Sequence, residues 1–218
     1  MDTMKYKNIF FDFDGVIAES VNVKTEAFYK LYEPYGREIA EKVKEHHLAH
    51  GGVSRFEKFR IYHDTFLDQQ IDDDKVQELA QKFSDLVVDG VVNAPEVDGV
   101  EVFIKKYSEE CRYFIITGTP TSEMIEIAKK RGILGHFMEI CGSPTKKNEW
   151  SEYLIEKYNL IRDDIVFLGD AKSDMGAANN SGIDFILRKN DENAELFKDY
   201  KGPSFLNFYE LNTYLEQQ

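Results

Sequence analysis

The sequence predicts an α/β protein with a Rossmann-like parallel-sheet core that is interrupted by an inserted, all-helical segment. From residue 112 onward, apolar segments of strand length alternate with helical patterns. Another strand-like segment stands near residue 10, and the chain between the two regions is helical in pattern. We therefore expect residues 1–17 and 95–218 to form the core and residues 18–94 to form a separate helical layer.

Five short apolar segments predict the strands of the core. "RYFIITG" and "DIVFLGD" are nearly continuous apolar runs, as expected of strands that helices cover on both faces. The five segments are Tyr6–Phe13, Arg112–Gly118, Phe137–Ser143, Asp164–Asp170 and Asp184–Lys189. The helical patterns between the later ones cover Thr121–Arg131, Lys147–Tyr158 and approximately Ser173–Ser181.

The inserted segment is rich in charge and lacks a convincing strand. It contains "TEAFYKLYEPYG", "SRFEKFRIYHDTFL" and "DDKVQELAQKFSDLVVDG", and Pro95 and Gly99 mark the junction where it ends. We interpret the acids at residues 72–74 as a loop and helix N-terminus rather than a metal site, because acids are favourable at that end of the helix dipole.

Composition limits the partners. The chain has 218 residues, 42% hydrophobic, and a net charge of −13, which argues against a general nucleic-acid binder and against docking on an anionic membrane. It shows no signal peptide and no apolar run of membrane-spanning length. Cys111 and Cys141 lack metal-ligand spacing, so we expect two buried free thiols and, with no signal peptide, a cytoplasmic setting. The sequence leaves the oligomeric state open, and we expect a monomer or a dimer.

Polar residues follow several of the predicted strands where each strand ends. Because ligands bind at the carboxyl ends of strands in open parallel sheets, we expect these side chains to meet in one crevice. The residues are Asp12 and Asp14 after the first strand, Thr117 and Gly118 at the second, Lys146 and Lys147 after the third, and Asp170 and Asp174 at the fourth.

Such a group suits phosphoryl transfer. Carboxylates hold Mg²⁺, a lysine and a hydroxyl neutralise and bind phosphoryl oxygens, one free carboxylate can attack phosphorus, and a second acid can move the proton. The alternative for Asp170 and Asp174 is an ordinary helix N-terminus, and for Thr117 a strand-end capping residue.

The motifs "DFDGVI", "FIITGT", "GSPTKK" and "GDAKSD" resemble, in order, the four motifs of the haloacid dehalogenase superfamily. The helical segment directly follows the first motif, as in members with a C1 cap. The resemblance implies a nucleophile at Asp12, a general acid/base at Asp14 whose carbonyl also binds Mg²⁺, and phosphate binding by Thr117 and Gly118. The remaining implied roles are metal binding by Asp170 and Asp174 and phosphate binding by Lys147, which the pattern "GSPxxK" selects over Lys146.

The insertion carries a second resemblance. "GGVSRFEKF" is similar to the cap loop of β-phosphoglucomutase and related enzymes, which implies that Arg55 approaches a substrate phosphate. Ser54 as N-cap with Glu57 as capping-box partner is a compatible structural interpretation. Lys24 stands where the mutase has a cap histidine. We interpret the remaining cluster as surface or hinge residues: His46, His47 and His50.

These observations favour a Mg²⁺-dependent phosphatase that hydrolyses a small phosphorylated metabolite, a sugar phosphate or phosphoglycolate-like compound, through an aspartyl-phosphate. A phosphosugar mutase is the first alternative: "GVSR" favours it, whereas "GSPTKK" lacks the lysine–proline pairing of those relatives. A receiver-like signalling domain is the second, and the two acids in one triplet and the helical insertion argue against it. Asp14 also disfavours a dehalogenase, because dehalogenating members lack that acid.

Overall fold

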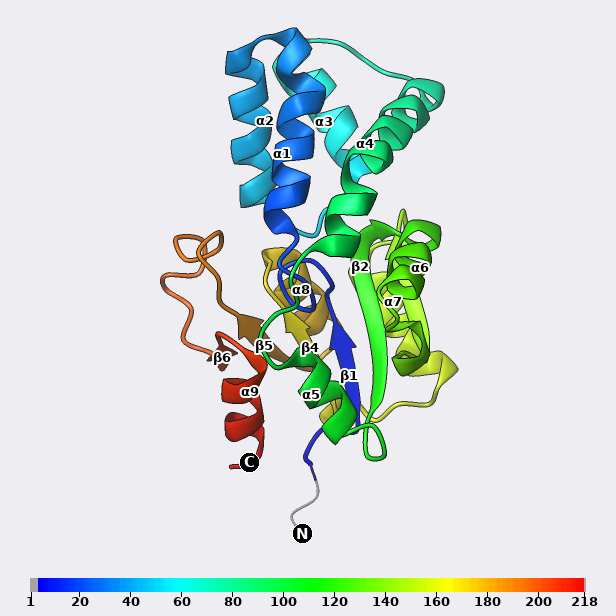
Figure 1. Ribbon diagram of the computed structural model, residues 1–218, viewed down its shortest axis with the longest axis vertical. Coiled ribbons are helices and arrows are strands. Elements are labelled where there is room, and N and C mark those ends of the chain that lie inside the picture. Colours follow the sequence, from blue (N-terminus) through cyan, green and yellow to red (C-terminus); the bar gives the residue numbers. More distant parts are fainter. Residues whose placement is uncertain (1–3, 218) are drawn as a thin grey trace.

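The computed structural model describes residues 4–217 and contains a six-stranded sheet in which all paired strands run parallel. The strand order is β3-β2-β1-β4-β5-β6, and the part from β2 to β6 can be followed in Figure 1. The strands are β1 (Asn8–Phe11), β2 (Arg112–Pro120), β3 (Glu139–Ser143), β4 (Ile165–Gly169), β5 (Asp184–Arg188) and β6 (Ser204–Phe205). The predicted parallel sheet is confirmed, and β6 is too short to have been recognised in the sequence.

Aromatic residues fix β1 at the centre of the sheet. Successive side chains of a strand point to opposite faces. On one face Phe10 packs edge-on against Phe114, with ring centroids 5.4 Å apart, and on the other Phe11 packs against Tyr113 at 5.7 Å. All of β1 is buried, so its end delivers the following residues to a fixed position.

Helices cover both faces of the sheet, as the apolar strands predicted. Buried residues of α5, α6 and α9 join the apolar cluster that contains Phe11, and those of α7 and α8 join the cluster that contains Phe10. The helices are α5 (Val100–Lys106), α6 (Thr121–Lys130), α7 (Lys147–Lys157), α8 (Lys172–Asn180) and α9 (Phe208–Leu215), with short 3₁₀ turns at Leu134–His136 and Arg162–Asp164.

The inserted segment forms a group of helices beyond the carboxyl ends of the central strands (Figure 1). They are α1 (Val21–Tyr32), α2 (Arg37–Ala49), α3 (Arg55–Leu67) and α4 (Asp73–Asn93), with a 3₁₀ turn at Glu33–Tyr35. Asp72 is the N-cap of α4 and accepts a hydrogen bond from Lys75 N at 2.8 Å. The interpretation of that acidic run as a helix N-terminus is therefore confirmed.

The two segments that connect the insertion to the sheet lie side by side. Val97 N donates to Ile17 O at 3.0 Å, and Glu19 N donates to Pro95 O at 2.9 Å. At the end of α6, Arg131 donates to the carbonyl oxygens of Val91, Val92 and Ala94 at 2.8–3.0 Å. This arginine stabilises the C-terminus of α4, where helical carbonyls lack intrahelical partners.

Two further expectations concern single features. Cys111 and Cys141 are buried and free, as predicted. None of the helices described between residues 4 and 217 combines the length and apolarity needed to cross a membrane.

Candidate active site

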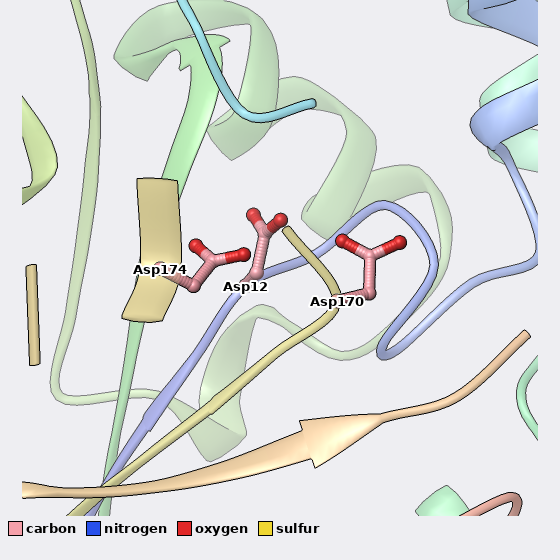
Figure 2. Close-up of side chains that lie close together, drawn as sticks. All are labelled: Asp12, Asp170 and Asp174. Carbon is pink, nitrogen blue, oxygen red and sulfur yellow. The ribbon is translucent and has the colours of Figure 1, made fainter. Parts of the chain in front are cut away.

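Three carboxylates meet where β1 and β4 end. Asp12 follows β1, Asp170 follows β4, and Asp174 lies in the first turn of α8 (Figure 2). Each offers an oxygen atom such that these atoms all lie within 4.8 Å of one another, and all three residues are buried. The structure therefore brings together three of the four acids that the sheet-edge argument selected.

Two glycines make this close approach possible. A Cβ on Gly15, whose φ of +76° is in the left-handed region, would lie 2.1 Å from Asp170 Oδ2. A Cβ on Gly169 would lie 2.2 Å from the Cβ of Asp174. Any other residue at either position would push the carboxylates apart.

Lys147, at the start of α7, links two of the carboxylates. Its Nζ lies 2.9 Å from Asp12 Oδ1 and 2.6 Å from Asp174 Oδ1, and its side chain is buried. Lys146 is the exposed N-cap of the same helix. The geometry thus distinguishes the two lysines and places Lys147 in the cluster.

Two asparagines that were not predicted from the sequence hold Asp170 in place. Asn190 Nδ2 donates to Asp170 Oδ2 at 3.1 Å, and Asn193 Nδ2 donates to the Asp170 carbonyl at 2.8 Å. Both asparagines follow β5, so applying the sheet-edge argument to the fifth strand would have identified them.

The cluster contains more acid than its one lysine balances. Burial raises the pKa of Asp12 to about 7; the Lys147 ammonium opposes this shift, and the Asp174 and Asp14 carboxylates add to it. Burial, with Asp12 and Asp174 nearby, also raises the pKa of Asp170 well above its ordinary value. Asp12 Oδ1 has no well-aligned hydrogen-bond donor within residues 4–217. A hard divalent cation fits this set of oxygen donors and would allow the acids to ionise together.

Asp14 points to a different set of partners and is outside this cluster. Its carboxylate pairs with the Lys24 ammonium and accepts a hydrogen bond from Ser20 Oγ at 2.6 Å. Lys24 Nζ also donates to Thr119 Oγ1 at 2.6 Å. Burial would raise the pKa of Asp14, but the Lys24 charge and the hydrogen bonds from Lys24 and Ser20 lower it.

The loop after β2 lies against the insertion. Thr117 is buried, and its Oγ1 accepts from Thr119 N at 3.2 Å. A Cβ on Gly118 would lie 2.6 Å from Gly52 O, so only glycine permits this contact. Thr117, Gly118 and Lys147 line one hollow beside the carboxylates. The three predicted phosphate-binding residues therefore lie together.

A second cavity lies between the core and the insertion. Asp12, Asp14 and Asp170 line it from the core. From the insertion, its lining includes charged, histidine and aromatic side chains: Lys24, Phe28, His47, Arg55, Lys58 and Phe83. Acids therefore lie on one side of the cavity and cations on the other.

Arg55 lines this cavity, and its guanidinium already has an acidic partner. Nη2 lies 2.6 Å from Glu123 Oε1, Nη1 lies 2.9 Å from Glu123 Oε2, and Nη1 also donates to Ser84 Oγ at 2.7 Å. Because Glu123 belongs to α6, this buried pair joins the insertion to the core. Ser54 is the N-cap of α3 as predicted, and it accepts from Phe56 N at 3.3 Å.

The interpretation of all three histidines as surface or hinge residues is wrong for His47. His50 is exposed, whereas His47 is buried and lines the cavity. Ala40 and Val43, seven and four positions earlier in α2, are also buried. This helical spacing places His47 on the inward face, and the periodicity of α2 would have revealed it.

Comparisons with known proteins agree with this geometry. Residues 9–188 match the family model described as haloacid dehalogenase-like hydrolase. A "Phosphorylated carbohydrates phosphatase" of Thermotoga maritima is 26% identical over 187 residues, which cover 82% of each chain.

Solved structures share the fold over nearly the whole chain. A protein of Haemophilus somnus described as a predicted phosphoglycolate phosphatase has a TM-score of 0.74 at 16% identity, covering 97% of this chain and 99% of that one. One from Bacteroides vulgatus, described as a β-phosphoglucomutase, has a TM-score of 0.78 at 16% identity, covering 99% and 89%. With the family model matching most of the sequence, this chain belongs to the haloacid dehalogenase-like hydrolases.

Proposed function

We propose that the protein is a Mg²⁺-dependent phosphatase that hydrolyses a small phosphorylated metabolite through an aspartyl-phosphate on Asp12. The observation that carries this proposal is the position of Asp12, next to Lys147 and the other acids at the base of a cavity that the insertion covers. The name of the Thermotoga relative supports a sugar phosphate as the substrate class.

The acids fit a resident Mg²⁺. Asp12 and Asp170 would hold it, together with the backbone carbonyl of Asp14 and with Asp174 as a ligand or a hydrogen-bonding neighbour of one. When bound, the ion neutralises charge on the phosphoryl oxygens and orients them toward the nucleophile. Lys147 and the Thr117 hydroxyl would bind the same phosphoryl group from the side of α7 and β2.

The chemical steps then use the two acids of the first motif. An Asp12 carboxylate oxygen attacks phosphorus, the bond between phosphorus and the ester oxygen breaks, and the leaving oxygen takes a proton from Asp14. Water next attacks phosphorus and gives a proton to Asp14 while the bond to Asp12 breaks. Inorganic phosphate leaves and Asp12 is restored. Asp14 is suited to the second step as it stands, because Lys24 favours its ionised form.

We also propose that residues 18–94 act as a cap. Lys24 reaches Asp14 from α1, and Arg55 reaches Glu123 from α3, so two ion pairs join the insertion to the core around the cavity. Closure of this kind excludes water from the acids and strengthens the electrostatic interactions inside. Opening the cavity would break both pairs.

A phosphosugar mutase is the competing function. The sequence resemblance that favoured it implies that Arg55 approaches a substrate phosphate, and a mutase would require Arg55 to hold a second one. In the structure two guanidinium nitrogens of Arg55 bind Glu123. This pairing favours a phosphatase in which Arg55 stabilises the closed cap. The Bacteroides match shows the fold alone at 16% identity.

Phosphate release from a panel of small phosphate esters tests the proposal. Wild-type protein should release inorganic phosphate with Mg²⁺, lose this activity in excess EDTA, and regain it when Mg²⁺ is restored. Full activity in excess chelator would overturn the metal assignment. Failure to release phosphate from any ester would overturn the phosphatase itself.

A further inference from the structure

The cationic side chains on the insertion side of the cavity differ in whether a carboxylate balances their charge. Lys24 pairs with Asp14, and Arg55 pairs with Glu123. Lys58 lines the same cavity, and within residues 4–217 no carboxylate forms an ion pair with it. The lining that the insertion supplies contains no acidic side chain.

Lys58 is also deeply buried. Its exposed fraction is 1%, and Nζ lies 2.8 Å from His47 Nδ1 and 5.5 Å from the centre of the Phe28 ring. Burial, with the Lys58 and Lys24 charges nearby, lowers the pKa of His47 and favours its neutral form, which can accept a hydrogen bond from the ammonium and cannot balance its charge. A buried ammonium without a counter-ion is costly, so a lysine at this position favours a ligand that supplies the missing negative charge.

We propose that Lys58, supported by His47, binds a second anionic group of the phosphorylated substrate. The group is a carboxylate or a second phosphate, both of which accept charge-assisted hydrogen bonds from an ammonium. The inference rests on the proposed function, because it assumes that the ester phosphate lies at Asp12. Asp12 and Lys58 line one cavity from its two sides, so a single small molecule can contact both.

The protonation of Lys58 agrees with this role. Burial, with the charges of Lys24 and Lys147 nearby, lowers the pKa of Lys58 to about 7, while Asp14 and Glu57 oppose the shift weakly. An anion beside Lys58 favours the ammonium and therefore restores the proton that burial removes.

Two matched substrate pairs test the proposal. Phosphoglycolate and 2-hydroxyethyl phosphate differ by a carboxylate against a hydroxyl, and fructose 1,6-bisphosphate and fructose 6-phosphate differ by a second phosphate. At pH 6.5, kcat/KM for the member with two anionic groups should exceed that of its partner by about 10- to 100-fold in at least one pair. The pair that shows the preference identifies the second group as carboxylate or phosphate.

Variants assign that preference to Lys58. Lys58→Met should reduce the preference to about threefold or less, because it lowers kcat/KM for the substrate with a second anionic group more than for the substrate without one. Lys58→Arg should retain most of the preference. Lys82→Met removes an exposed lysine of α4 and should behave as wild type, which controls for the net charge of the insertion.

The outcomes separate this inference from the proposed function. Phosphate release without a preference in either wild-type pair, or a preference that survives Lys58→Met, overturns the role of Lys58 and leaves the phosphatase standing. If no ester is hydrolysed, the phosphatase fails, and calorimetric titration of Asp12→Asn with both members of each pair decides the inference. Tighter binding of a member with two anionic groups supports it, and equal binding overturns it. The wild-type ratios apply even if Lys58→Met fails to fold.

Discussion

Two buried lysines face the space between core and insertion, and their surroundings are opposite. Lys147, on the core, lies between the carboxylates of Asp12 and Asp174, and these charges raise its pKa against the effect of burial. Lys58, on the insertion, has a neutral imidazole and an aromatic ring as neighbours, and burial lowers its pKa. Carboxylates of the protein balance the charge of Lys147, whereas no carboxylate of residues 4–217 pairs with Lys58.

This difference separates two tasks. The core holds an excess of acid that a divalent cation would balance, together with a lysine that is charged before substrate arrives. The insertion presents Lys58, whose positive charge an anionic group of the substrate would balance. We infer that the core carries out phosphoryl transfer on any ester that reaches it, whereas the insertion selects which ester does. The following predictions test each side of this division.

The largest effect is expected at Asp12. Asp12→Asn keeps the shape of the side chain and removes the charge of the nucleophile, so kcat should fall by about 10³-fold or more while circular dichroism shows that the protein stays folded. Asp163→Asn, at an exposed acid, is the control and should have wild-type activity. Retention of a tenth of the wild-type rate would exclude Asp12 as the nucleophile.

The second-largest effect is expected from a change that weakens the metal site. Asp170→Ala removes one oxygen donor of the acid cluster, so calorimetric titration should show at least about tenfold weaker Mg²⁺ binding, and activity should require correspondingly more Mg²⁺. Because Asn190 and Asn193 hold Asp170 in place, Asn190→Ala should have a smaller effect in the same direction. Unchanged Mg²⁺ affinity in Asp170→Ala would contradict the assignment.

The ion pair between Arg55 and Glu123 tests how the insertion is held. If Arg55 acts by closing the cap, Arg55→Met and Glu123→Gln should both raise KM by about 10- to 100-fold, because each loses a charge-assisted interaction of about 1.5–3 kcal/mol. Arg60→Met, at an exposed arginine of the same helix, is the control. A large effect of Arg55→Met with none from Glu123→Gln would instead indicate direct contact with substrate.

The smallest effect concerns stability. The pKa of Lys58 is about 7 in the folded protein and near 10.5 when unfolded, so its ionisation opposes folding fully below pH 7 and ceases to do so above pH 10.5. Lys58→Met should therefore be more stable than wild type by about 1–3 kcal/mol at pH 6.5, and the difference should shrink as pH rises toward 9.5. Chemical denaturation at several pH values measures it. Destabilisation at pH 6.5 would indicate that Lys58 is structural.

The sequence was sufficient for the core because each signal there is local. Strands buried on both faces are apolar runs, and the sheet-edge argument places the residues that follow Phe11 and Gly169 together without further information. The choice between Lys146 and Lys147 also agrees with the motif spacing. These features depend on the order of elements along the chain, which the sequence shows directly.

The insertion side of the cavity could not be read in the same way. Glu123 lies 68 positions from Arg55, and nothing in either segment indicates that they pair. Lys58 stands in "RFEKFR", and nothing in this segment distinguishes the one charged residue that is fully buried from the others. Its burial results from helix packing. The burial of His47 could have been predicted, because its spacing from Ala40 and Val43 places all three on one face of α2. Its contact with Lys58 of α3 depends on tertiary packing, which the sequence does not show.

The central claim is that this chain releases phosphate from an ester instead of moving it within a sugar. A phosphorus NMR time course of wild-type protein with Mg²⁺ and either glucose 1-phosphate or phosphoglycolate, with and without added glucose 1,6-bisphosphate, tests it most directly. The account predicts that the inorganic phosphate signal grows at the expense of at least one ester and does not depend on the bisphosphate. Accumulation of glucose 6-phosphate that requires the bisphosphate, with little free phosphate, would contradict it.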